Sequence, residues 1–415
     1  MKKRRRPVVK AFLLVALLIV VAVVGYYQTL PRLSDDRLAS VEHRVWDDAF
    51  RIPADSGLTR ARSIAQSLEL PSVTFAAAVD GRIVWEASVG WSDLSARLGA
   101  STETRYRTGS VAKSITSVIL GRLAASGAVD LDSPVRTYLP EAVGPVGDAT
   151  IRQIAGHMGG VRHYARRPGR EVLAENFNRT HFDEARTALD LFLHDSLLFA
   201  PGTDFAYSTH GFTLLSAALE SASGRPFLVL LDEEVVQPGG LVGTGPDDVT
   251  VAIPDRAVTY VQLGERYIDP PDADPSYKWA GGGLLTTAGD LARLGSALMD
   301  HELLDSSFVE ELWTPQRMPD GSPNPQNYGM GWRIDREAGL IGRRDTVRVI
   351  HHGGASPGGS AFLLLVPADR VAIAVLTNRS LDNPGPLRRE AYWAAGAFAR
   401  AHDSTRAPVV SLDAN

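Results

Sequence analysis

Residues 108–113 read Thr-Gly-Ser-Val-Ala-Lys, and apolar residues follow at helical spacing over 111–126. If a helix begins near Ser110, the three-residue separation places Ser110 and Lys113 on one helical face. A serine hydroxyl is a weak nucleophile that needs a base, and a lysine in a dry pocket has a lowered pKa that suits it to that task. The helix N-terminus adds partial positive charge where an oxyanion would form. The alternative is a serine that caps an ordinary helix, with Lys113 in solvent.

The scarcity of lysine gives Lys113 more weight. Only five of the 43 basic residues are lysines, and after the N-terminal segment only Lys113 and Lys278 are left. Arginine serves for surface charge, but it does not release its proton in a protein, whereas a buried lysine does. A lysine kept in such a chain is therefore a candidate for proton transfer, although for a single lysine chance survival is the favoured explanation.

Two further clusters carry candidate groups. Residues 205–209 read Phe-Ala-Tyr-Ser-Thr, where Tyr207 is either a proton-sharing group or an ordinary interface tyrosine. Residues 351–354 read His-His-Gly-Gly between two predicted strands, where an imidazole can bind a carboxylate and backbone N–H groups can complete an oxyanion hole. A metal site is disfavoured, because adjacent side chains on a strand point to opposite faces.

Taken together, these motifs resemble those of a known family. Ser-x-x-Lys, Tyr-x-Thr and His-x-Gly occur in that order, and the separation in residue number is 97 from Ser110 to Tyr207 and 144 from Tyr207 to His351. This layout is similar to that of class C β-lactamases, penicillin-binding proteins and related esterases, and most of all to their mitochondrial serine β-lactamase-like branch. Flanking stretches at 149–164, 277–298 and 328–332 add to the resemblance, which covers roughly residues 58–400.

The resemblance implies a role for each motif. Ser110 would attack a carbonyl and form an acyl-enzyme, while Lys113 and Tyr207 would manage its proton. The substrate and oxyanion contacts would come from the Ser110 N–H and from Thr209, His351, Gly353 and Gly354. Two residues depart from the common pattern: Thr209 stands where many relatives have asparagine, and His351 where they have lysine. We therefore expect peptidase, amidase or esterase activity rather than strong β-lactamase activity, and no cofactor or metal.

Residues 354–358 also fit the pattern G-x-S-x-G. The nucleophile elbow of an α/β-hydrolase requires a strand, a sharp turn and then a helix. Here Pro357, Gly358 and Gly359 lead into another predicted strand. This alternative nucleophile, Ser356, is therefore disfavoured.

The N-terminus predicts a membrane helix. Residues 1–10 form a basic tail with six basic side chains, and the 17 residues of 11–27 carry no charge. A helix of that length spans about 26 Å, near the minimum for a membrane crossing. The basic flank places the N-terminus in the cytoplasm and the domain outside it, in the periplasm or the extracellular space. A cleaved signal peptide is the rival interpretation, but the small residues of a cleavage site are missing near Gly25, and we predict an uncleaved signal-anchor.

The remaining pattern predicts an α+β fold. Extended runs flank an Asp-Gly turn at 80–81, helical runs fill 111–299, and extended runs return at 347–350, 361–366 and 371–376. We expect the first and last strands to complete one antiparallel sheet flanked by helices, with an all-helical lobe beside it. The predicted division is a connector at 28–57 with a short helical piece around 38–50, a catalytic domain at 58–400 and a polar tail at 401–415.

Composition narrows the function further. The net charge of −5 gives no basic surface for nucleic acid, and the absence of cysteine excludes a disulfide framework, a thiolate nucleophile and a lipoprotein anchor. The leading hypothesis is a serine hydrolase acting on a small peptide, amide or ester. A weakly catalytic scaffold is the second, since a member of the mitochondrial branch assembles into filaments and self-assembly is left open. A penicillin-binding sensor that deacylates slowly is the third.

Overall fold

The computed structural model describes residues 5–164, 178–270, 273–340 and 346–402. The predictions for the first four residues and for the tail beyond 402 lie outside this part of the chain. Among the described residues, the main sheet has the strand order β1-β3-β2-β13-β12-β11-β10, with β4 beside β3, and every pairing is antiparallel. The strands are β1 (Val41–Val45), β2 (Ser72–Val79), β3 (Arg82–Asp93), β4 (Leu98–Gly99), β10 (Arg333–Ala338), β11 (Thr346–Ser356), β12 (Gly359–Val366) and β13 (Val371–Thr377).

The predicted α+β fold is confirmed. The first and last parts of the chain meet where β2 pairs with β13, from Val73 opposite Thr377 to Val79 opposite Val371. The hairpin between β2 and β3 turns at Asp80 and Gly81, whose φ angles of +48° and +80° suit the Asp-Gly pair that the sequence offers there.

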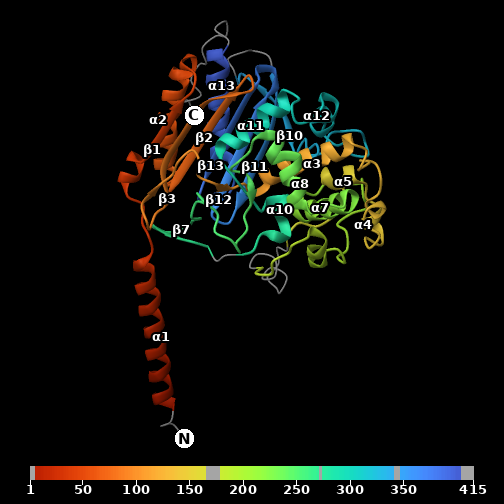
Figure 1. Cartoon of the computed structure of the whole chain (residues 1–415). Coiled ribbons are helices and arrows are strands. Elements are labelled where there is room, and N and C mark those ends of the chain that lie inside the picture. Colours follow the sequence, from red (N-terminus) through yellow and green to blue (C-terminus); the bar gives the residue numbers. More distant parts are fainter. Residues whose placement is uncertain (1–4, 165–177, 271–272, 341–345, 403–415) are drawn as a thin grey trace.

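Side chains of the central strands alternate between two cores. On β13, Val371, Ile373 and Val375 join one core, whereas the residues between them join the other. Helices α2 (Arg51–Ser67) and α13 (Gly385–His402) pack on the first face, and α11 (Ala288–Met299) packs on the second, next to the helical lobe (Figure 1).

The helical lobe lies beside the sheet and supplies much of the second core. Its helices are α3 (Ala112–Ala125), α4 (Pro145–Asp148), α5 (Ile151–Ala155), α7 (Thr209–Ser223), α8 (Phe227–Leu231), α9 (Gln237–Gly239), α10 (Trp279–Gly282) and α12 (Ser306–Leu312). A small sheet of β5 (Tyr106–Arg107), β9 (Leu284–Thr286) and β6 (Gly245–Pro246) connects the lobe to the main sheet. The ends of the helices follow local rules: Thr150 and Gln153 form a capping box on α5, and Gly224 ends α7 in the left-handed conformation.

One local expectation is wrong. Residues 38–50, expected to form a short helical piece, contain the strand β1, which pairs along β3 from Val41 opposite Val89 to Val45 opposite Trp85. Strand formation here depends on a partner that is distant in sequence, so local helical preference gives way to pairing. The main sheet and α2 therefore take in residues that the sequence assigned to the connector.

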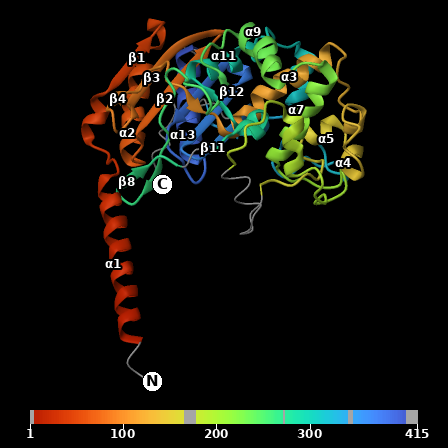
Figure 2. The same ribbon diagram turned by 60° about the horizontal axis from the view of Figure 1, so that its bottom comes forward.

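The N-terminal helix α1 (Arg5–Thr29) projects away from the domain (Figures 1 and 2). Its segment Phe12–Thr29 is long and apolar enough to cross a membrane by length and composition. Its end is held by the hairpin of β7 (Val261–Leu263) and β8 (Arg266–Ile268). Arg266 donates to the Gln28 side chain at 2.8 Å and to the carbonyl of Leu30, and its guanidinium lies 5.6 Å from the ring centroid of Tyr27.

Candidate active site

Ser110 lies in a 3-10 turn (Gly109–Val111) between β5 and α3. Thr108 fixes the start of this turn, because its N–H and its hydroxyl both donate to the carbonyl of Leu284 at 2.9 Å. Gly109 has a φ of +49°, which favours glycine, and a Cβ there would lie 2.6 Å from the backbone nitrogen of Ala355. The turn therefore presents Ser110 directly against strand β11.

Lys113 is fully buried one turn further along and reaches back to the nucleophile. Its Nζ lies 3.3 Å from Ser110 Oγ, 3.0 Å from Thr209 Oγ1 and 2.5 Å from the carbonyl oxygen of Gly281. Burial lowers the pKa of Lys113 well below that of a free lysine, and the nearby charges of Lys278 and Arg333 lower it further. A neutral amine has two N–H donors and one lone pair, which matches two carbonyl or hydroxyl acceptors and the Ser110 hydroxyl.

Tyr207 lies on the other side of Lys113, with Nζ 4.9 Å from its ring centroid. Burial raises the pKa of Tyr207 to about 12, although the nearby Ser110 hydroxyl and Arg333 act against the shift. The phenol hydroxyl forms no hydrogen bond within standard geometry among the described residues. Catalytic hydrogen bonds are often long before substrate binds, and a phenol with this pKa is a proton donor at neutral pH.

Two histidines hold the segment that carries Tyr207 and Thr209. The backbone N–H of Ser208 donates to His157 Nδ1 at 3.3 Å, and that of Thr209 donates to His163 Nδ1 at 3.1 Å. An imidazole nitrogen accepts a hydrogen bond only when it carries no proton, so both rings hold this segment in their neutral form. Burial lowers the pKa of His157 well below its usual value, which favours that form. Sequence reasoning did not select either histidine.

The structure separates the two adjacent histidines of β11. His352 lies among the aromatic side chains of the site: its Nε2 is 3.0 Å from the Tyr328 hydroxyl, and its ring centroid is 6.2 Å from that of Tyr207. His351 lies on the opposite face of the strand, with Nε2 2.9 Å from Asp335 Oδ2 and its ring stacked on Phe362. The imidazole next to Tyr207 is therefore that of His352, and the role predicted for His351 stays a prediction.

Strand β11 passes so close to Ser110 that it requires glycine there. A Cβ on Gly354 would lie 1.9 Å from the Thr108 carbonyl oxygen and 3.1 Å from the Ser110 backbone nitrogen. The next residue, Ala355, lines both cavities that Ser110 lines, whereas Gly353 lines only the larger of them. The contribution of the Gly354 N–H to an oxyanion hole stays a prediction.

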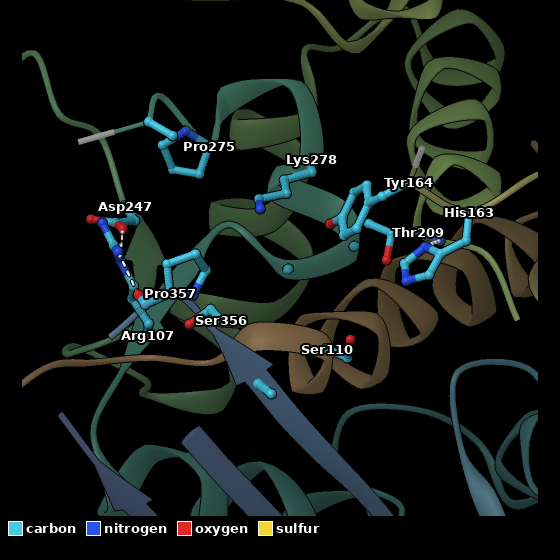
Figure 3. Close-up of a pocket in the computed structure, with 14 residues that line it drawn as sticks. Arg107, Ser110, His163, Tyr164, Thr209, Asp247, Pro275, Lys278, Ser356 and Pro357 are labelled. Atoms are coloured by element: carbon cyan, nitrogen blue, oxygen red, sulfur yellow. Dashed lines mark hydrogen bonds and ion pairs between the residues drawn. The ribbon is translucent and has the colours of Figure 1, made fainter. Parts of the chain in front are cut away.

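Ser110 opens onto two cavities. The smaller, of about 150 Å³, contains Lys278, Tyr164 and an ion pair of Arg107 with Asp247 (Figure 3). The larger, of about 490 Å³, is lined by the residues Ser110, His163, Tyr207, Arg333, His351, Gly353, Ala355, Phe362, Pro384, Gly385 and Arg388. Arg333 makes no ion pair with any described residue, and its guanidinium lies 5.6 Å and 5.7 Å from the ring centroids of Tyr207 and Tyr328. Arg333 was not among the residues predicted from the sequence, although it directly follows the Tyr-Gly-Met-Gly-Trp stretch at 328–332.

Comparison with known proteins identifies the family of the chain. The model of the family described as Beta-lactamase matches residues 60–398. The chain belongs to this beta-lactamase family. It is similar to the human protein "Serine beta-lactamase-like protein LACTB, mitochondrial", with 27% identity over 405 residues that cover 78% of this chain and 73% of that protein.

Other members of the beta-lactamase family are similar over much of the chain. The D-aminopeptidase of Gluconobacter oxydans (strain 621H) is 26% identical over 312 residues, which cover 74% of this chain and 56% of that protein. The crystal structure of the penicillin binding protein from Bacillus halodurans superposes with a TM-score of 0.67 at 25% identity, covering 79% of this chain and 97% of that one. The family thus places the chain in the serine hydrolase superfamily of penicillin-binding proteins and aminopeptidases.

Proposed function

We propose that this chain is an active serine hydrolase that cleaves a peptide or amide through an acyl-enzyme on Ser110. The observation that carries the proposal is the contact between Lys113 Nζ and Ser110 Oγ, made by a lysine that is fully buried and has a lowered pKa. A buried ammonium that served only the structure would be costly. A neutral amine beside the hydroxyl instead provides the base that a serine nucleophile needs.

In acylation, the Ser110 hydroxyl proton passes to Lys113 Nζ as Oγ forms a bond to the substrate carbonyl carbon. The carbonyl oxygen takes on negative charge beside the N–H of Ser110 at the start of α3, and N–H groups of β11 at Gly354 and Ala355 lie next to this turn. The C–N bond then breaks, and the leaving amine takes a proton from the Tyr207 phenol, which Lys113 reprotonates. Water hydrolyses the resulting ester, with the same groups moving its proton.

His352 is proposed to support this proton transfer by position. Burial lowers its pKa well below the usual value, so its ring stays neutral beside Tyr207 and adds no positive charge next to Lys113. With Nδ1 2.7 Å from the carbonyl of Gly353 and Nε2 next to the Tyr328 hydroxyl, the ring is held from both sides. His351, paired with Asp335, lines the outer part of the larger cavity.

The proposed substrate is a small peptide or amide with a carboxylate on the side of the larger cavity. Arg333 lies there without a carboxylate partner among the described residues and next to the Tyr207 ring. A guanidinium binds a carboxylate through paired N–H donors. The name of the D-aminopeptidase relative supports an amide substrate.

The test is covalent labelling of the detergent-solubilised full chain with a fluorophosphonate and separately with a penicillin. We expect one fluorophosphonate adduct by intact mass, located on Ser110 and absent from Ser110→Ala. Ser356→Ala is the matched control, because Ser356 is the alternative nucleophile of the G-x-S-x-G pattern, and it should label like the unmodified chain.

Other labelling results distinguish the alternatives. A penicillin adduct that lasts for hours would favour the slow-deacylating sensor. No adduct on folded protein with either reagent would rule out the hydrolase and favour the weakly catalytic scaffold, whose self-assembly light scattering would measure.

We further propose that α1 is an uncleaved anchor and that the domain lies outside the cytoplasm. Support comes from the apolar segment Phe12–Thr29 and from the contacts of Arg266 with Gln28 and Leu30, which join the end of the helix to the folded domain. The expected result is a chain that stays in the membrane fraction after carbonate washing, keeps its N-terminal peptide in mass spectrometry and is cut by protease added outside the cell. A mature chain that begins after Gly25 would exclude the anchor, and protection from external protease would exclude the location.

A further inference from the structure

The smaller cavity beside Ser110 holds a cation without a counter-ion. Figure 3 shows the Lys278 side chain directed into this cavity, between Pro275 and Tyr164. Its ammonium forms no hydrogen bond or ion pair with any described residue. Two aromatic rings flank it, with Nζ 5.2 Å from the centroids of both Tyr164 and Tyr277.

The one acidic residue in the described lining does not neutralise Lys278. Asp247 Oδ2 accepts from Arg107 Nε at 2.7 Å, and its Oδ1 accepts from Arg256 Nε at 2.8 Å. Both carboxylate oxygens are therefore engaged by arginines. With Arg107, Arg256 and Lys278 facing a single carboxylate, the described charges in and behind the cavity sum to a positive excess.

The fold itself does not require the Lys278 side chain. The residue's backbone does the structural work: its N–H donates to the carbonyl of Pro275 at 2.9 Å, and its carbonyl accepts from the N–H of Gly283 at 3.1 Å. Other side chains would allow these two hydrogen bonds. Burial and the charge of Arg107 lower the pKa of Lys278 to about 8, with Asp247 acting against them, so the ammonium remains mostly charged at pH 7.

We propose that the smaller cavity is an anion subsite, in which Lys278 binds a carboxylate on a substrate side chain next to the scissile amide. The proposal rests on the proposed function, because it takes Ser110 as the reacting group at the mouth of the cavity. It adds to the carboxylate expected near Arg333, since Lys278 lines only the smaller cavity and Arg333 only the larger, and the two cavities share just Ser110, His163 and Ala355 among their described lining residues. The enzyme would therefore prefer aspartyl or glutamyl substrates over the matching amides.

Binding can be measured without catalysis in the Ser110→Ala full chain. The probes are N-acetyl-aspartate amide and N-acetyl-asparagine amide, together with the glutamate and glutamine pair, in both L and D forms, titrated by calorimetry. Of the aspartate and glutamate probes, we expect the one that binds more tightly to bind at least about tenfold more tightly than its matching amide, since a hydrogen bond between charged groups contributes about 1.5–3 kcal/mol. Lys278→Met should bring the ratio close to one, and Lys278→Arg should restore most of it. Lys278→Gln replaces Lys278→Met if that variant does not fold.

Two results would overturn the proposal. One is a ratio of acid affinity to amide affinity that does not change when Lys278→Met is added to Ser110→Ala. The other is a ratio of one for every pair of probes when Lys278 is kept. Failure of the proposed function has a separate signature, which is the absence of a fluorophosphonate adduct on Ser110 in the unmodified chain. Fluorophosphonate labelling of Lys278→Met reports only whether Ser110 still reacts in that variant, and its rate is expected to change, because the charge of Lys278 also lowers the pKa of Lys113.

Discussion

Replacing Lys113 with methionine is expected to slow acylation of Ser110 by about 10³-fold, the middle of the range for loss of a general base. The same variant should unfold at a temperature no lower than that of the unmodified chain. Methionine has a similar length and no charge, so it fills the space without providing a base. The measurements are the rate of fluorophosphonate labelling by intact mass and the thermal unfolding of the same samples.

The stability prediction follows from burial. Lys113 is 0% exposed, and its Nζ lies 4.9 Å and 5.5 Å from the ring centroids of Tyr207 and Phe212. Because the folded pKa of Lys113 is lowered, the unfolded chain keeps this proton to a higher pH than the folded chain, and stability rises with pH until the unfolded lysine loses its own proton. Methionine removes this penalty, while the Gly281 carbonyl and the Thr209 hydroxyl each lose a donor at a cost of about 1–3 kcal/mol. The stability advantage of the variant should shrink as the pH rises.

Lys113→Arg is the matched control, because it keeps the charge and removes the ability to act as a base. We expect it to be as inactive as Lys113→Met and also less stable, since a guanidinium is larger and stays charged in the same buried space. Labelling of Lys113→Met within tenfold of the normal rate would show that Lys113 is not the base. Equal loss of stability in both variants would show that the buried amine holds the lobe together.

The sequence predicted that Ser110 and Lys113 lie together, because the two residues are within one helical turn of each other. The three-residue separation of Ser110 and Lys113 is local, and helical geometry alone brings the two side chains together. The α+β fold also followed from the order of strands and helices. The strand β1 was missed, because its hydrogen bonds lie on β3, about forty residues away.

The partners around this pair could not be predicted in the same way. A choice between His351 and His352 depends on which face of β11 each side chain takes, and the motif pattern says nothing about that. The apolar residues just before the two histidines indicate the faces of β11. Val347 and Val349 belong to the core on the side of α2 and α13, whereas Ile350 belongs to the core on the side of α11 and the helical lobe. Alternation from Ile350 places His352 on the site face and His351 on the other. His157, His163 and Arg333 come from three separate segments that only the folded chain brings together.

The same alternation leads to the second large effect, in Gly354→Ala. The new Cβ would lie 1.9 Å from the Thr108 carbonyl oxygen, so β11 and the nucleophile turn would have to move apart by about 1.5 Å to reach ordinary contact. The Thr108 carbonyl oxygen and the Ser110 nitrogen that this Cβ would meet are backbone atoms, so no flexible side chain can give way. We expect the rate of Ser110 labelling to fall by about 10²-fold or more, the cost of a misplacement of this size. Overpacking should also lower the free energy of unfolding by about 1–3 kcal/mol.

Two other glycine-to-alanine substitutions serve as controls that distinguish misplacement of Ser110 from a general loss of stability. A Cβ on Gly353 would meet the side chains of Pro384 at 2.5 Å and Phe362 at 3.3 Å, and none of its three nearest atoms belongs to the nucleophile turn, whereas one on Gly245 has nothing within 4 Å. Gly353→Ala should therefore lose stability but keep most of its labelling rate, and Gly245→Ala should change little. Labelling is measured well below the unfolding temperature of each variant, so that only folded protein reacts. If Gly354→Ala labels as fast as Gly353→Ala, β11 does not constrain the position of the nucleophile, and its N–H groups are too far away to stabilise an oxyanion on the substrate.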